Sequence, residues 1–195
     1  MPSSISRLTA LDHARLHRLL RRVVTEGPSQ ERWREEALHL LAAHRVAERE
    51  VLTSDALRPA GPEALAAAQE LDRADDELDR AAAAVAAVPV PSPELASLGE
   101  RLATLVARHA DLTHRVLAPL ESAVARKEIR LLGGEYESRR DDHLLRLGAD
   151  EPPPRRLDLS RAELYELARR HGIEGRSAMS RRDLIAELQR RTGED

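Results

Sequence analysis

Residues 93–117 read PELASLGERLATLVARHADLTHRVL, and this stretch decides the fold class. Its apolar side chains recur at alternating spacings of three and four, the inward-facing stripe of a helix in a bundle. One position of the stripe holds a histidine, and burying a polar group without a partner costs roughly 1–3 kcal/mol. We therefore expect this imidazole to have a partner. The stripe consists of Leu95, Leu98, Leu102, Leu105, His109, Leu112 and Val116.

Three other segments show the same replacement of an apolar residue by one that can bind a metal. Each segment has the periodicity of an amphipathic helix, and in each the exceptional side chain lies in the apolar stripe. Helical bundles build metal and cofactor sites from such inward-facing side chains on facing helices. The three are His13 within residues 7–24, His44 within residues 30–52 and Asp75 within residues 62–87.

Prolines and glycines separate these helices and predict where others end. The Pro-rich stretch 89–93 cannot be helical and forms the linker before the helix that begins near Pro93. Pro119 predicts a kink, after which helical periodicity resumes over residues 120–132. Gly133 and Gly134 predict a break, followed by a further, highly charged helix over residues 135–147.

Composition excludes several function classes. The formal net charge of −3 over 195 residues does not suit a protein that binds nucleic acid over its whole surface. The absence of cysteine excludes disulfides and thiolate metal sites. No long apolar run and no secretory signal pattern is present, so we expect a cytoplasmic protein with no membrane contact.

Spacing within the helices defines the candidate metal ligands. His44 and Glu48 are four residues apart, so both lie on one helix face, where an imidazole and a carboxylate can reach the same ion. These ligand types suit iron, manganese or zinc. His114 follows His109 by five residues, which places it about 140° around the helix. It is a candidate ligand only if Pro119 distorts the helix locally.

The residues resemble a hemerythrin-like, HHE-type cation-binding domain over about residues 7–132. The resemblance is carried by Asp12-His13, by the His44-to-Glu48 spacing, and by His109 followed ten residues later by Pro119. It implies an up-down four-helix bundle that holds non-haem iron, mononuclear or di-iron. The implied ligands are His13, His44, Glu48 and His109.

Two positions depart from the pattern of that family. Asp75 is the best match to the usual histidine on the third helix, with Asp72 as the alternative, and Asp75 is expected to supplement the ligands. Thr113 and His114 occupy the positions where the fourth helix usually carries a carboxylate. These departures are compatible with a more labile metal site or with no metal site at all.

The C-terminal segment has a different character. Pro152 to Pro154 form a stiff spacer, and residues 159–188 resemble the small helix–loop–helix modules of the Rho-termination-factor N-terminal or SAP-like type. Two Ser-x-x-acid patterns, at Ser160 and Ser180, predict the helix starts. The resemblance implies weak DNA or RNA contact, for which the candidate residues are Arg176, Arg181 and Arg182. A docking unit that uses its apolar residues only as its own core is the alternative.

The sequence thus predicts an all-α protein: a hemerythrin-like up-down four-helix bundle over residues 1–148 with an extended last helix, a linker over 149–157, and the small module over 158–195. The leading hypothesis is an iron-binding protein that senses or buffers oxygen, nitric oxide, peroxide or iron. The alternative is a metal-free helical scaffold or adaptor whose C-terminal module binds DNA, RNA or a protein. An enzyme is disfavoured, because di-iron oxidases use paired Glu-x-x-His motifs. Such a pair occurs on the second helix only at Glu36 and His39, and His39 lies off the apolar stripe.

Overall fold

The computed structural model describes residues 4–25, 27 and 29–148, together with parts of the C-terminal segment. Those parts are residues 164–165, 168–169, 173, 175–180, 183–184 and 187. The chain divides into two compact units, Pro2–Glu151 and Pro152–Asp195. Among the described residues every regular element is helical, and no helix is long and apolar enough to cross a bilayer.

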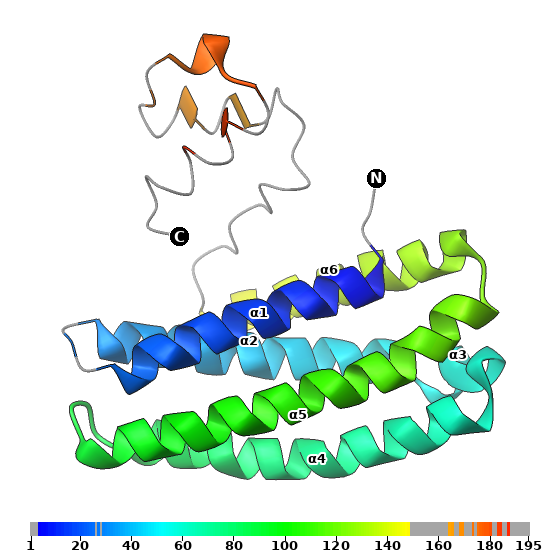
Figure 1. Cartoon of the computed structure of the whole chain (residues 1–195), viewed down its shortest axis with the longest axis horizontal. Helices are drawn as coiled ribbons and strands as arrows, with labels where there is room; N and C mark the ends of the chain where they lie inside the picture. Colours follow the sequence, from blue (N-terminus) through cyan, green and yellow to red (C-terminus); the bar gives the residue numbers. More distant parts are fainter. Residues whose placement is uncertain are drawn as a thin grey trace. The chain divides into compact units, whose positions relative to one another are not determined.

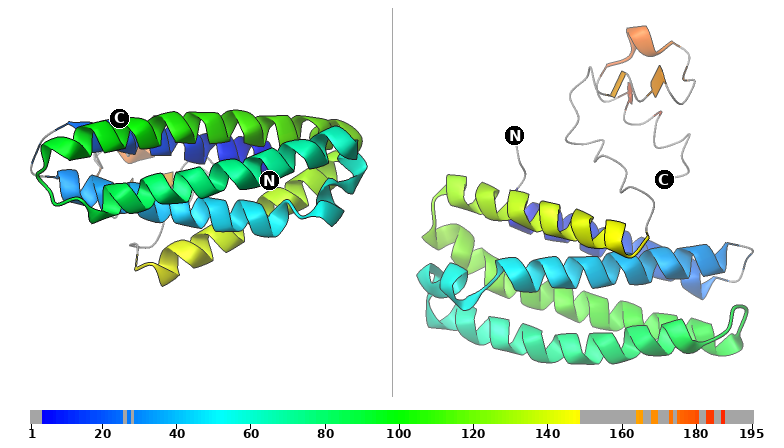
Figure 2. Two further views of the ribbon diagram at one scale, coloured as in Figure 1. Left: turned by 90° about the horizontal axis from the view of Figure 1, so that it is seen from below. Right: turned by 180° about the vertical axis from the view of Figure 1, so that it is seen from behind.

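Five long helices pack together in the first unit (Figure 1). Successive long helices run in opposite directions, with α1 beside both α2 and α5, and α4 beside α5. Helix α6 lies against α2 and α1 and crosses them obliquely (Figure 2). The long helices are α1 (Ile5–Val24), α2 (Gln30–Val51), α4 (Gly61–Ala87), α5 (Pro93–Ala123) and α6 (Arg126–Arg146). The short helix α3 (Ser54–Leu57) and a 3-10 turn, η1 (Arg58–Ala60), connect α2 to α4.

The helix boundaries after residue 117 differ from the sequence-based expectation. Helix α5 continues through Pro119 to Ala123, and the break falls at Val124 and Ala125, both extended. The Glu128 carboxylate accepts a hydrogen bond from the Ala125 N–H at 3.1 Å and caps the start of α6. The break expected at Gly133 and Gly134 is wrong, because α6 runs through both.

Packing explains why the two glycines do not end α6. Each costs about 1 kcal/mol relative to alanine in a helix interior. Gly133 itself is buried, on the face that also buries Ile129 and Tyr136. Fully burying one large apolar side chain is worth about 1.5–3 kcal/mol, so burial on this face offsets the cost of the glycines.

The apolar interior of the first unit falls into two clusters, with a polar layer between them. On each of the four helices that carry a predicted metal-binding residue, the boundary between clusters lies at that residue. On α1, Leu8 belongs to one cluster and Leu16 to the other, with His13 between them. The same division falls at His44 on α2, at Asp75 on α4 and at His109 on α5.

The described part of the second unit has a small core of its own, made of Leu164, Ala168, Ile173 and Leu184. The helix start predicted at Ser180 is confirmed. The Ser180 hydroxyl accepts a hydrogen bond from the Asp183 N–H at 3.2 Å, and the Asp183 carboxylate accepts from the Ser180 N–H at 3.0 Å. The pattern at Ser160 lies outside the described residues. Residues Arg176–Ala178 form the 3-10 turn η2.

Candidate metal centre

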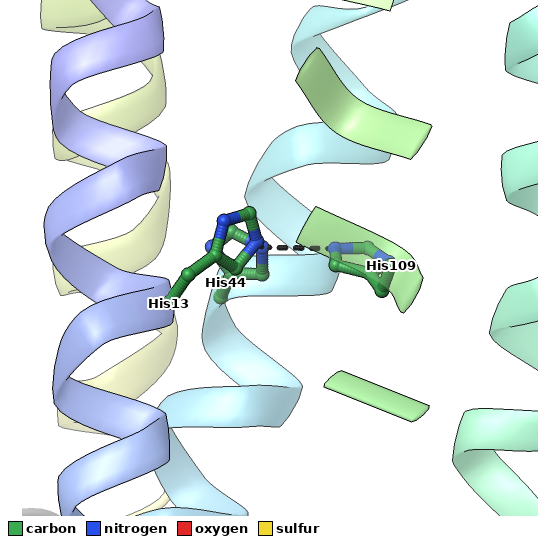
Figure 3. Close-up of side chains that lie close together, drawn as sticks. All are labelled: His13, His44 and His109. Carbon is green, nitrogen blue, oxygen red and sulfur yellow. Dashed lines mark hydrogen bonds between the residues drawn. The ribbon is translucent and has the colours of Figure 1, made fainter. Parts of the chain in front are cut away.

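Three buried histidines from three helices meet in the polar layer (Figure 3). His13 comes from α1, His44 from α2 and His109 from α5, and their rings point toward one another. The Nε2 atom of His44 lies 3.0 Å from Nε2 of His13 and 3.1 Å from Nε2 of His109. The three side chains are close enough to bind one metal ion, as the sequence predicted.

Glu48 adds a carboxylate to this cluster. It follows His44 by one helical turn and is only 2 % exposed. Its Oε2 atom lies 3.0 Å from Nε2 of His109 and 3.7 Å from Nε2 of His44. Its Oε1 atom is buried and has no hydrogen-bond partner among the described residues. The carboxylate therefore faces the same interior point as the imidazoles.

Asp75 contacts the His109 ring on the side that faces away from the three Nε2 atoms. Its Oδ1 atom accepts a hydrogen bond from Nδ1 of His109 at 2.9 Å, so it stands on the side of the ring opposite Nε2. Its Oδ2 atom lies 3.2 Å from a guanidinium nitrogen of Arg45, which is 5 % exposed. Arg45 also bonds Asp79. A carboxylate behind a ligating histidine fixes its tautomer and ring orientation.

Tyr136 contacts Nδ1 of His44, as Asp75 contacts Nδ1 of His109. Its hydroxyl lies 2.5 Å from Nδ1 of His44 and donates a hydrogen bond to Oδ2 of Asp12 at 2.6 Å. Because the hydroxyl proton is directed to Asp12, the phenol oxygen can accept the Nδ1 proton of His44, which leaves the Nε2 lone pair facing the cluster. Arg140 on α6 donates to both oxygens of Asp12, at 2.9 and 3.1 Å.

The sequence did not indicate that Tyr136 and Arg140 contribute to a site, and it pointed to Asp12 only as part of the Asp12-His13 resemblance. The available signal was Tyr136 itself, one of only two tyrosines in the chain, placed within a highly charged helix.

The buried charges shift one another's pKa values. Burial disfavours the imidazolium form of His109, but Glu48 and Asp75 outweigh it and raise its pKa to about 9. Burial, together with neighbouring His44 and His109, lowers the pKa of His13 to about 3. Burial would raise the pKa of Glu48, but the three imidazoles outweigh it and lower it to about 2. Without a metal, the cluster therefore keeps a proton on His109 opposite an ionised Glu48.

Two residues expected among the ligands lie elsewhere. Asp75 is in the polar layer, as its position in the stripe indicated, but it faces Nδ1 of His109 and not the three Nε2 atoms. His114 is exposed on α5 and does not reach the cluster, which corrects the prediction that it is a ligand. Five residues of helix turn it away from His109, and α5 is not distorted enough to bring it back. Thr113, one of the two residues at which the resemblance implied a carboxylate, is buried.

The structure places only one of the three candidate nucleic-acid-binding arginines. Arg176 is half-buried, donates a hydrogen bond to the Ile173 carbonyl at 2.9 Å, and lies with its guanidinium 5.5 Å from the centre of the Tyr165 ring. These contacts hold it to its own unit. Arg181 and Arg182 lie outside the described residues, so their contact with phosphates stays a prediction.

Comparisons of the chain with known protein families, with curated proteins and with solved structures give no match. The interpretation of the site therefore rests on its own residues and geometry.

Proposed function

We propose that this protein binds a single transition-metal ion through His13, His44, His109 and Glu48. One observation carries the proposal. The imidazole Nε2 atoms lie close to one another, while Nδ1 of His44 contacts Tyr136 and Nδ1 of His109 contacts Asp75. When His44 and His109 are both neutral and protonated on Nδ1, their Nε2 lone pairs face one another at 3.1 Å, and either a proton on His109 or a cation at that point removes the repulsion.

The spacing of the donor atoms supports one ion of octahedral preference. With metal–nitrogen bonds of about 2.1 Å, neighbouring ligand atoms are about 3.0 Å apart in an octahedral shell and about 3.4 Å apart in a tetrahedral one. Two Nε2–Nε2 separations are 3.0 and 3.1 Å, and Glu48 Oε2 lies 3.0 Å from Nε2 of His109. These three values match the octahedral edge, whereas the 3.7 Å between Glu48 Oε2 and Nε2 of His44 is longer than that edge.

We infer that iron is the resident metal and that the protein senses or buffers a small redox-active molecule or iron itself. Imidazole with carboxylate is a ligand set that suits iron. The resemblance to hemerythrin-like domains points the same way. Four protein donors are fewer than the six of an octahedral ion, so such an ion has room for an exogenous ligand such as oxygen, nitric oxide or peroxide.

The test is elemental analysis of untagged protein after expression in iron-supplemented medium, with an optical spectrum recorded before and after exposure to air. We expect about one ion per chain in the unmodified protein. His109→Ala removes a proposed ligand, and His114→Ala on the exposed face of the same helix is the matched control. The ion should be lost in the first variant and kept in the second, while both retain their helical circular dichroism. Less than about a tenth of an ion per chain in the unmodified protein would end the proposal.

A metal-free scaffold is the second candidate function. It is favoured by one observation, since a protonated His109 ring can donate from Nε2 to Glu48 and from Nδ1 to Asp75 without any ion. In that case His109→Ala would lower stability but would change no metal content, so the same experiment separates the two functions.

A further inference from the structure

A pocket of about 390 Å³ lies beside α3 and leads from the surface into the polar layer. We call it the α3 pocket. Its exposed polar lining consists of Arg49, Thr53, Ser54, Gln69 and Asp72. Its buried polar lining consists of Glu48 and Asp75, and the rest of the lining is apolar. The pocket therefore connects solvent with one proposed metal ligand and with the carboxylate behind the His109 ring.

The histidine cluster lies where an ion cannot arrive directly from solvent. Its side chains are buried, and an apolar cluster lies on each side of the polar layer. Glu48 joins the histidine cluster to the α3 pocket, because it lines the pocket while its Oε2 atom lies 3.0 Å from Nε2 of His109. The Oε1 atom of Glu48 is buried and has no hydrogen-bond partner within the described part of the chain. One oxygen of Glu48 is therefore available to an ion that arrives through the pocket.

The charge and the size of the α3 pocket suit a hydrated cation. Its lining contains three carboxylates, those of Glu48, Asp72 and Asp75, and one guanidinium, that of Arg49. The carboxylates lie at different depths, with Asp72 exposed and the other two buried. Six water molecules occupy about 180 Å³ in the liquid, so an ion with a full hydration shell fits into the pocket. Such an ion can exchange its waters for carboxylate oxygens inside the pocket.

Arg49 lies at the entrance of the α3 pocket. Its guanidinium is 3.9 Å from Oδ2 of Asp75, so this contact joins α2 to α4 across the pocket lining. The Arg49 side chain is 60 % exposed, and an ion pair of this length with an exposed partner is weak. When Arg49 turns away, Asp75 keeps its closer contact with Arg45 at 3.2 Å. Opening the entrance therefore leaves no buried charge without a partner.

We propose that the α3 pocket is the entrance through which a divalent metal ion reaches the histidine cluster, and that Arg49 controls its passage. This inference rests on the proposed function, because it requires a metal ion at the cluster. Arg49 is not a proposed ligand, so it affects the barrier to passage and not the stability of the bound ion. A residue of this kind changes the rates of uptake and release by the same factor, whereas a ligand changes the affinity.

The test measures the rates of uptake and release with Co²⁺ alone as the probe, because bound Co²⁺ has an optical spectrum. A site that holds iron should also take Co²⁺, since affinity for Co²⁺ generally exceeds that for Fe²⁺. Metal-free full-length protein is mixed with Co²⁺ to follow uptake, and loaded protein is mixed with excess chelator to follow release. Arg49→Gln should speed both by about threefold to fivefold and change the equilibrium affinity by less than about twofold. Arg101→Gln, which removes the same charge from an exposed position on α5, is the control and should change neither rate.

Ala68→Phe tests whether the ion passes through the α3 pocket. Ala68 lines the pocket, and Ala66→Phe on the exposed face of the same helix is the control. Ala68→Phe should slow uptake and release by about tenfold or more at unchanged affinity, and Ala66→Phe neither. Ala68→Leu serves if the phenylalanine variant does not fold.

The possible failures can be told apart. Unchanged rates in the Ala68 variants would overturn the entrance, and unchanged rates in Arg49→Gln would overturn its control by Arg49. A changed affinity with unchanged release would overturn both, because the residues would then act on the bound state. In each of these cases the unmodified protein still takes up Co²⁺ and the proposed function stands. No uptake by the unmodified protein would overturn the proposed function, and the entrance with it.

Discussion

Tyr136 and His44 are 92 residues apart in the chain, yet the Tyr136 hydroxyl lies 2.5 Å from Nδ1 of His44. Through this contact α6 is part of the candidate metal centre, although it supplies none of the clustered histidines. The contact continues through Asp12 to Arg140, so α6 meets the centre at two points one turn apart.

Removing the Tyr136 hydroxyl should weaken metal binding. In Tyr136→Phe, His44 loses the acceptor that fixes its tautomer, and Asp12 loses a donor. Losses of this kind reduce metal affinity by about 10- to 100-fold. The measurement is a competition titration against a chromophoric chelator, with Tyr165→Phe in the second unit as the control. Equal affinities for the two variants would show that α6 does not support the site.

Asp75 should matter more for stability than any neighbouring acid. Asp75→Asn keeps the size of the side chain but leaves the buried Arg45 without the charge of its buried partner. Breaking a buried ion pair costs about 3–5 kcal/mol; we expect the lower end of this range, because Arg45 keeps its contact with the exposed Asp79. Urea unfolding of the metal-free protein measures the loss, and Asp76→Asn on the exposed face of α4 should change stability by less than about 0.5 kcal/mol.

The pH dependence of stability should differ between metal-free and metal-loaded protein. The pKa of His109 is 6.5 as a free side chain and about 9 in the metal-free fold, so between these values the folded chain holds a proton that the unfolded chain has lost. Its contribution to stability is complete below pH 6.5 and is lost as the pH rises toward 9. A metal on His109 replaces that proton, so the loaded protein should not show this decline. Urea unfolding from pH 6 to 9.5, with and without a chelator, measures it; parallel curves would contradict the assignment.

Deleting residues 149–195 should leave the first unit folded. That unit contains both large apolar clusters and all residues of the candidate centre, and the chain divides at residue 151 into two compact units. Thermal unfolding of the truncated and full-length proteins should give midpoints within a few degrees of each other. A large drop would show that the second unit stabilises the first.

Helix periodicity was sufficient to predict the centre of the site. A side chain in the apolar stripe must point inward, so His13, His44 and His109 could be identified from spacing alone, and Glu48 from its place one turn after His44. For the same reason Asp75 was correctly expected in the interior. Periodicity does not say which atom a buried carboxylate will meet, and Asp75 faces Nδ1 of His109 where a metal ligand was expected.

The contribution of α6 could not be predicted in this way. Its sequence is too highly charged to show an apolar stripe, and its two glycines argue locally against a helix at their position. What holds it is the packing of Ile129 and Tyr136 and the pairing of Arg140 with Asp12, which is 128 residues away. Contacts of this range depend on how helices pack together, and no local pattern encodes them.

The separation of the apolar interior into two clusters affects how the first unit can move. The buried side chains at one end, with Leu16, Leu40 and Val106, form a network distinct from the apolar cluster at the end that holds α3. Loosening around α3 can therefore proceed while the cluster at the other end stays ordered. Such local opening does not require global unfolding of the first unit.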